Sequence, residues 1–197
     1  ANVVLVMIVS EGQETSRINN RIAIIPGARN GIGAAAARRF VAEGAKVFLI
    51  GRNEAALNRL RDELTQEKCD VMVGDIALEK TNQDMVKACS SRFGNPDIAL
   101  INAGIEGAAA HIPEYPTDIF DDVIAINVRG VFLGLKYSLP SMSLKGGSII
   151  ITSSIAGLKA RGMGNSAYVA SKHAEIGLMR TAAIENASSN IRVNCVL

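Results

Sequence analysis

Short apolar runs rich in β-branched residues alternate with longer segments of helical period from residue 21 to the end of the chain. The runs lie at residues 22–25, 47–50, 71–73, 98–101, 148–152 and 191–196. Consecutive apolar positions are typical of strands covered by helices on both faces, whereas a half-solvated antiparallel strand alternates apolar and polar residues. The alternation therefore indicates βαβ units around a parallel sheet.

The segments between these runs predict helices at residues 32–43, 53–66, 80–93, 117–138 and 167–187. Gly44 fits a C-terminal stop for the first helix, and Asn53 fits an N-cap for the second. Because such crossovers are right-handed, we expect an α/β fold with a doubly wound parallel sheet, three αβα layers and strand order 3-2-1-4-5-6.

The length and composition fit one domain and exclude several classes of partner. The 197 residues, 48% of them hydrophobic, suffice for one α/β core. A net charge of +2 without a basic run gives no indication of nucleic-acid binding. The longest apolar runs, about seven residues, fall far below the roughly 18 that a membrane span requires. Because residues 1–10 lack the pattern of a secretory signal, we expect a cytoplasmic protein that binds no membrane.

The cysteines do not indicate a metal site or a disulfide framework. Cys69, Cys89 and Cys195 are odd in number, far apart and never arranged as Cys-x-x-Cys. We interpret them as reduced, buried thiols.

A glycine-rich turn follows the first apolar run and opens an alanine-rich helical segment. The candidate cofactor-binding residues of this turn are Gly27, Arg29, Asn30, Gly31, Ile32 and Gly33. Glycines allow a tight turn and close approach of a pyrophosphate, and the helix N-terminus supplies unpaired N–H groups for the anion. A turn that merely needs small residues is the alternative, but the position between a strand and a helix favours a dinucleotide site.

The second strand ends without the acidic residue that would bind the adenosine ribose of NAD. Gly51 holds that place and Arg52 follows it. A guanidinium can pair with a 2′-phosphate, so we predict NADP(H) in preference to NAD(H), with help from Arg29. A solvated arginine on a turn is the competing interpretation.

Tyr168 and Lys172 lie four residues apart on a predicted helix and therefore share one face. Lowering a tyrosine pKa from about 10 to about 7 takes about 4 kcal/mol. One cation at about 4 Å supplies roughly that amount in an effective dielectric near 20. Tyr168 would then give and take a proton at neutral pH. Taken alone, the spacing is common by chance and is more typical of a surface pair.

Further polar or glycine motifs follow other predicted strands. They are Asp75-Ile76, Asn102-Ala103-Gly104 and Ser153-Ser154. Because the carboxyl ends of parallel strands share one rim, where ligands bind, these motifs favour a site there over ordinary turns.

Together these features resemble the short-chain dehydrogenase/reductase family, over about residues 21–197. The resemblance implies a Rossmann-type sheet, a nicotinamide cofactor and interconversion of a small-molecule alcohol and a ketone or aldehyde by hydride transfer. The residues that carry it are Gly27, Gly31, Gly33, Asp75, Asn102, Ala103, Gly104, Asn127, Ser154, Tyr168 and Lys172.

The resemblance also implies roles for four catalytic residues. Tyr168 would exchange a proton with the substrate oxygen, and Ser154 would hydrogen-bond that oxygen. Lys172 would hold the cofactor ribose and lower the pKa of the tyrosine. Asn127 would hold a water that connects Lys172 to solvent. Ser153 is the alternative to Ser154, whose distance along the chain from Tyr168 is one residue longer than usual in the family.

By the same resemblance, Asp75 and Ile76 would contact the adenine, and Asn102 to Gly104 would border the cofactor ribose. Two departures weaken the match. Pro26 replaces the family's usual threonine before the first glycine, and Asn30 stands where NADP-preferring relatives carry a basic residue.

The ends of the chain fit the resemblance less well. Residues 1–20 form an N-terminal extension, an additional edge strand or a packing arm, before the domain of residues 21–197. The family continues past Leu197 with a substrate lid and another strand, so we expect this domain to lack both. Three functions stay open: an oxidoreductase, a sugar-nucleotide epimerase or dehydratase, and a cofactor-binding protein without activity. The resemblance further implies a homodimer or homotetramer, formed through helices 117–138 and 167–187.

Overall fold

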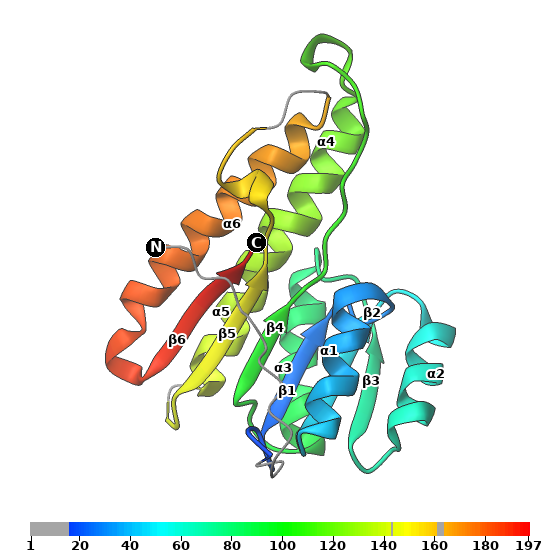
Figure 1. Cartoon of the computed structure of the whole chain (residues 1–197), viewed down its shortest axis with the longest axis vertical. Helices are drawn as coiled ribbons and strands as arrows, with labels where there is room; N and C mark the ends of the chain where they lie inside the picture. Colours follow the sequence, from blue (N-terminus) through cyan, green and yellow to red (C-terminus); the bar gives the residue numbers. More distant parts are fainter. Residues whose placement is uncertain (1–15, 143, 161–163) are drawn as a thin grey trace, which may run out of the picture.

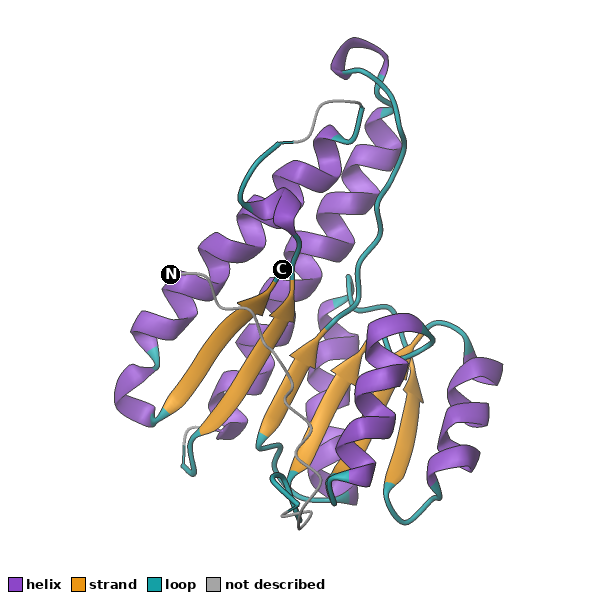
Figure 2. Ribbon diagram, in the orientation of Figure 1, coloured by secondary structure: helices purple, strands orange, loops and turns teal. Residues whose placement is uncertain are grey.

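A six-stranded parallel sheet in the order β3-β2-β1-β4-β5-β6 forms the centre of the molecule (Figures 1 and 2). This computed structural model describes residues 16–142, 144–160 and 164–197. The predicted strand order is confirmed. The apolar run at residues 3–9 lies outside the described residues.

The predicted strands and helices are all present with small shifts at their ends. The strands are β1 (Ile22–Pro26), β2 (Lys46–Gly51), β3 (Cys69–Val73), β4 (Ile98–Ile101), β5 (Gly147–Thr152) and β6 (Ile191–Val196). The helices are α1 (Gly31–Ala42), α2 (Glu54–Leu64), α3 (Glu79–Arg92), α4 (Thr117–Val123), α5 (Gly130–Met142) and α6 (Ser166–Glu185). Asn53 caps α2 as predicted, because its side chain accepts a hydrogen bond from Ala56 N at 2.9 Å.

Helices cover the two faces of the sheet with separate apolar clusters. On one face, Leu57 and Leu60 of α2 and Ala37 of α1 pack against Leu49 and Leu100 of the sheet. On the other face, α3 packs against β1 and β2, while α5 and α6 pack against β4, β5 and β6. The strands thereby hold their carboxyl ends along one rim of the molecule (Figure 2).

The expectation that every strand is covered on both faces is wrong for β6. Ile191 and Val193 are buried under α5 and α6, whereas Arg192 and Asn194 on the opposite face are exposed. Within the described ranges, no helix covers that opposite face of β6, so the three-layer arrangement is incomplete there (Figure 2). The strand consequently alternates apolar and polar residues, as a half-solvated strand does.

The segment predicted as one helix at 117–138 is longer and contains a π-helical part. The π-helix Ile124–Arg129 joins α4 to α5, which continues to Met142. A π turn widens the helix by one residue per turn and is often found at functional sites. Asn127 lies in this π turn and is fully buried. No helix among the described residues is long and apolar enough to cross a membrane.

Candidate active site

A cavity of about 740 Å³ lies at the carboxyl ends of the strands. The predicted site residues that line it are Gly27, Arg29, Asn30, Gly31, Ile32, Arg52, Asp75, Ile76, Asn102, Ala103, Gly104, Tyr168 and Lys172. Three others do not line it: Gly33, Asn127 and Ser154. The cavity is at the rim where parallel α/β sheets bind ligands.

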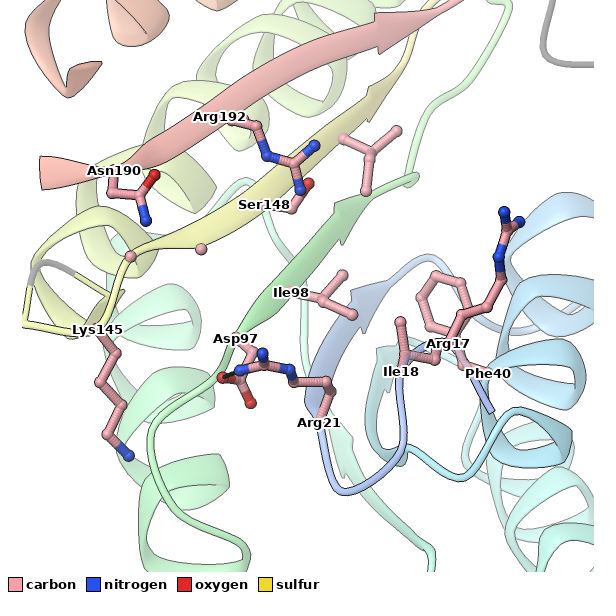
Figure 3. A pocket seen from close by; sticks show the side chains of 13 residues that line it. Arg17, Ile18, Arg21, Phe40, Asp97, Ile98, Lys145, Ser148, Asn190 and Arg192 are labelled. Carbon is pink, nitrogen blue, oxygen red and sulfur yellow. Dashed lines mark hydrogen bonds and ion pairs between the residues drawn. The ribbon is translucent and has the colours of Figure 1, made fainter. Parts of the chain in front are cut away.

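A second, smaller cavity of about 450 Å³ lies at the opposite, amino ends of the strands (Figure 3). Its wall includes Lys145 and Arg192, together with Arg21, which forms an ion pair with Asp97 at 2.8 Å. None of the predicted site residues lines this cavity. We therefore assign the candidate active site to the cavity at the carboxyl ends.

The glycine turn after β1 has room only for glycine at two positions. A Cβ added to Gly27, whose φ is +84°, would lie 2.6 Å from the backbone N and Cα of Ala103. A Cβ added to Gly33 would lie 2.3 Å from the Gly27 carbonyl oxygen. At Gly31, with φ +53°, an added Cβ would meet no atom within 4 Å. The turn thus forms an open cradle, which fits the pyrophosphate of a dinucleotide.

The turns after β1 and β4 are joined by a side chain. Asn102 Nδ2 donates a hydrogen bond to the Gly27 carbonyl oxygen at 2.9 Å. The amide N–H of Asn102 also bonds to the Pro26 carbonyl oxygen, at 3.2 Å. The predicted cofactor motifs at Gly27 and Asn102 are therefore held together as one surface.

Arg29 and Arg52 lie on the side of the cavity next to the end of β2. Both side chains are exposed and line the cavity. In the part of the chain that the structure describes, neither forms a salt bridge, so both guanidinium groups are available to an anionic ligand. Gly51 at the end of β2 presents no side chain that would compete.

Tyr168 and Lys172 share a face of α6, as their spacing predicts. The Lys172 Nζ atom lies 5.4 Å from the centre of the Tyr168 ring. Lys172 is 4% exposed, and its Nζ donates a hydrogen bond to the Thr152 carbonyl oxygen at 2.9 Å. Because the Lys172 ammonium is buried, bulk water screens its charge little. That charge therefore acts more strongly on neighbouring groups than the charge of an exposed lysine would.

Glu175 is a site residue that the sequence analysis missed. Its carboxylate oxygens lie 2.9 Å and 3.1 Å from Lys172 Nζ, and the residue is 1% exposed. Burial raises the pKa of the Glu175 carboxyl, while the ammonium of Lys172 opposes the rise. The sequence signal that could have revealed Glu175 was its spacing of three residues from Lys172, which places the two side chains together on a helix.

Asn127 supports the site from behind the cavity wall. Its side chain bonds to both the N–H and the carbonyl of Ile105, at 2.9 Å and 2.8 Å, and donates to Ser171 Oγ at 3.0 Å. An added Cβ at Gly104 would lie 3.3 Å from Asn127 Oδ1 and 3.7 Å from Lys172 Nζ. Asn127 therefore holds in place the segment around Ile105, which lines the cavity. The expectation that Asn127 holds a water molecule stays a prediction.

The two candidate serines occupy different surroundings. Ser153 lines the cavity, is buried, and donates a hydrogen bond to the Lys172 carbonyl oxygen at 3.3 Å. Ser154 caps the short 3₁₀ turn Ile155–Gly157, and its Oγ accepts a hydrogen bond from Ala156 N at 3.1 Å. The predicted catalytic role of Ser154 stays a prediction, with Ser153 as its alternative.

One buried hydroxyl of the cavity wall is unsatisfied. Thr152 Oγ1 has no hydrogen-bond partner among the described residues, although the side-chain oxygen is inaccessible to solvent. Buried polar atoms normally have a partner.

The two histidines of the chain have ordinary surroundings. His173 is exposed, and its Nδ1 lies 2.9 Å from the Val169 carbonyl oxygen. His111 is exposed as well. No group of three potential metal ligands is found within the described ranges.

Known proteins resemble this chain in sequence and in structure. The short chain dehydrogenase family pattern matches residues 21–197. Levodione reductase of Leifsonia aquatica is 37% identical over 188 residues, which cover 92% of this chain and 70% of that protein. Borneol dehydrogenase of Lavandula x intermedia is 40% identical over 184 residues, which cover 91% of this chain and 69% of that protein. The crystal structure of NAD⁺-bound xylitol dehydrogenase matches with a TM-score of 0.86 at 36% identity, covering 91% of this chain and 70% of that one.

Proposed function

This chain belongs to the short-chain dehydrogenase family of oxidoreductases, and on that premise we propose that it interconverts an alcohol and a ketone or aldehyde with a nicotinamide cofactor. The observation that carries the proposal is the placement of Tyr168 and Lys172 on the same cavity as the glycine cradle. A proton-transferring side chain beside a dinucleotide cradle is what this reaction requires.

The residues of the cavity fit such a cofactor. The cradle at Gly27 and Gly31 would hold the pyrophosphate, and Asn102 to Gly104 and Lys172 would hold the ribose next to the nicotinamide. Asp75 and Ile76 would border the adenine. When bound, the cofactor supplies or takes up the two electrons of the reaction.

The side chains of α6 would handle the proton. In the oxidation direction, the phenolate oxygen of Tyr168 takes the hydroxyl proton of the alcohol, and in reduction the phenol returns it to the carbonyl oxygen. The position of the Lys172 ammonium, 5.4 Å from the centre of the Tyr168 ring, supports this role. A serine hydroxyl, from Ser154 or the cavity-lining Ser153, would donate a hydrogen bond to the substrate oxygen.

We favour NADP(H) over NAD(H). The support is the pair of exposed guanidinium groups of Arg29 and Arg52, which form no ion pair with any described residue, next to Gly51, where a carboxylate would repel a 2′-phosphate. NAD(H) is the second candidate, because the similar xylitol dehydrogenase structure is described as NAD⁺-bound. Assembly into a homodimer or homotetramer stays a prediction.

The replacement Tyr168→Phe tests the proposal. It removes one hydroxyl, so turnover of small alcohols and ketones should fall by about 10²- to 10⁴-fold, the contribution of a general acid or base. Affinity for NADPH, followed by the cofactor's own fluorescence, should not change. Tyr137→Phe is the matched control, since Tyr137 lies on α5 outside the cavity and bonds to Glu79. Full turnover by Tyr168→Phe would refute the assigned role, and cofactor binding without turnover by the unmodified chain would favour a cofactor-binding protein without activity.

A further inference from the structure

The Lys172 ammonium has an acceptor inside the protein for each of its three protons. Two are the carboxylate oxygens of Glu175, at 2.9 Å and 3.1 Å, and the third is the Thr152 carbonyl oxygen, at 2.9 Å. Lys172 and Glu175 lie one turn apart on α6 and are both almost completely buried. A ligand that reaches Lys172 therefore meets an ion pair rather than a single cation.

The charge of Glu175 is held inside the protein by its neighbours. The Lys172 ammonium, which bonds to both carboxylate oxygens, favours the ionised carboxyl, against the burial that raises its pKa. The field of the carboxylate also reaches Cys195 on β6, whose thiol pKa it helps to raise. Charges in such surroundings are screened by salt and water much less than surface charges are.

Stability alone does not account for this carboxylate. A buried ion pair loses most of its mutual attraction to the cost of removing both charges from water, and an apolar pair of similar volume usually serves the fold as well. Glu175 is one of the buried residues of α6, next to Ile176 and one turn after Ser171, which bonds to Asn127. An acidic side chain at this position therefore points to a role at the cavity that Lys172 lines.

The proposed function supplies that role, and the inference rests on it. The nicotinamide ring is positively charged in the oxidised cofactor and neutral in the reduced one. A fixed negative charge stabilises the former relative to the latter. We propose that Glu175 is a positioning residue that holds Lys172 in place and, through its charge, makes the site favour the oxidised nicotinamide cofactor over the reduced one.

The two parts of this role have different signatures. The hold on Lys172 affects the ribose, which both redox states share, so its loss changes both dissociation constants by the same factor. The charge of Glu175 acts on the nicotinamide ring alone, so its loss changes the ratio of the two dissociation constants. For a unit charge about 10 Å away, in an effective dielectric between about 20 and 40, the ratio changes by about fourfold to fifteenfold.

The test measures binding, without turnover. Dissociation constants of the oxidised cofactor, by calorimetry, and of the reduced cofactor, by its fluorescence, are determined for the unmodified chain and for Glu175→Gln. The variant should lose about fourfold to fifteenfold of the preference for the oxidised form. Glu175→Met, which removes the charge with a differently shaped side chain, should give the same ratio, so the test does not depend on one variant folding. Glu185→Gln, the same change at an exposed position near the end of α6, should leave the ratio unaltered.

The possible outcomes separate the inference about Glu175 from the proposed function. An unchanged ratio would overturn the assigned effect of the Glu175 charge while leaving the proposed function intact, and unchanged dissociation constants for both forms would also overturn the hold on Lys172. Failure of the unmodified chain to bind either form would overturn the proposed function, and the inference with it.

Discussion

Replacing Gly33 by alanine tests whether the cofactor cradle depends on close packing. Gly33 lies in the first turn of α1, beneath the cradle rather than on the cavity wall. A Cβ there would lie 2.3 Å from the Gly27 carbonyl oxygen and 2.7 Å from Asn102 Nδ2. Both neighbours are held in place, because they bond to each other at 2.9 Å.

The cost follows from these contacts. Forcing a methyl group into a packed region costs about 1–3 kcal/mol. Separating Asn102 from Gly27 loses a hydrogen bond worth about 0.5–1.5 kcal/mol. Alanine returns about 0.5–1 kcal/mol through its better helix propensity. The free energy of unfolding should therefore fall by about 1–3 kcal/mol, and NADPH binding should weaken because the cradle is distorted.

Urea unfolding followed by circular dichroism measures the stability, and the fluorescence of NADPH measures the binding. Gly177→Ala is the matched control, because Gly177 lies inside α6 and an added Cβ would meet no atom within 4 Å. That variant should be more stable by about 0.5–1 kcal/mol and bind the cofactor normally. A Gly33→Ala chain as stable as the unmodified one, with unchanged NADPH binding, would refute the packing argument.

Two further predictions concern charge and burial. Arg52→Ala should weaken NADPH binding about tenfold or more, the loss of a charge-assisted contact to phosphate, and leave NADH binding unchanged; equal losses for both cofactors would contradict the assignment. Burial raises the pKa of Cys69 and Cys89 to about 12 and that of Cys195 to about 11, so the native thiols should resist alkylation at about pH 8. The unfolded chain releases these protons from about pH 8.5 whereas the folded chain keeps them, so stability should fall as pH rises from about 9 toward 12. Rapid labelling of Cys69 or Cys89 in the native chain, read by mass spectrometry, would be inconsistent with the burial of these two thiols, whereas Cys195 is only partly buried.

The sequence predicted the sheet because its signals are local. The first five apolar runs are each followed by a turn residue, and right-handed crossovers then favour a doubly wound order such as 3-2-1-4-5-6. The alternation of Arg192 and Asn194 with apolar residues was visible in the sequence, but we interpreted the run as a strand covered on both faces, which is wrong for β6. The π turn was not predictable, because it accompanies the hydrogen bonds of Asn127 to Ile105, which is 22 residues away along the chain.

The site was predicted where residue types alone carry the signal. The glycine cradle, Tyr168 and Lys172 lie together as expected. Glu175 was missed because an acidic residue on a helix is ordinarily solvated, and only the packing of α6 against the sheet buries it. The choice between Ser153 and Ser154 depends on the backbone after β5, which places one hydroxyl on the cavity and the other on a turn.

The bond between Asn102 and Gly27 bears on the order of folding events. The two residues are 75 positions apart in the chain, yet the glycine turn takes its shape against the segment after β4. Contacts between such distant segments form only after the intervening chain has lost much of its freedom. A nascent or partly folded chain that has made only β1, α1 and β2 therefore has no finished cradle, and a cofactor that binds as proposed would bind only molecules in which β4 has already docked.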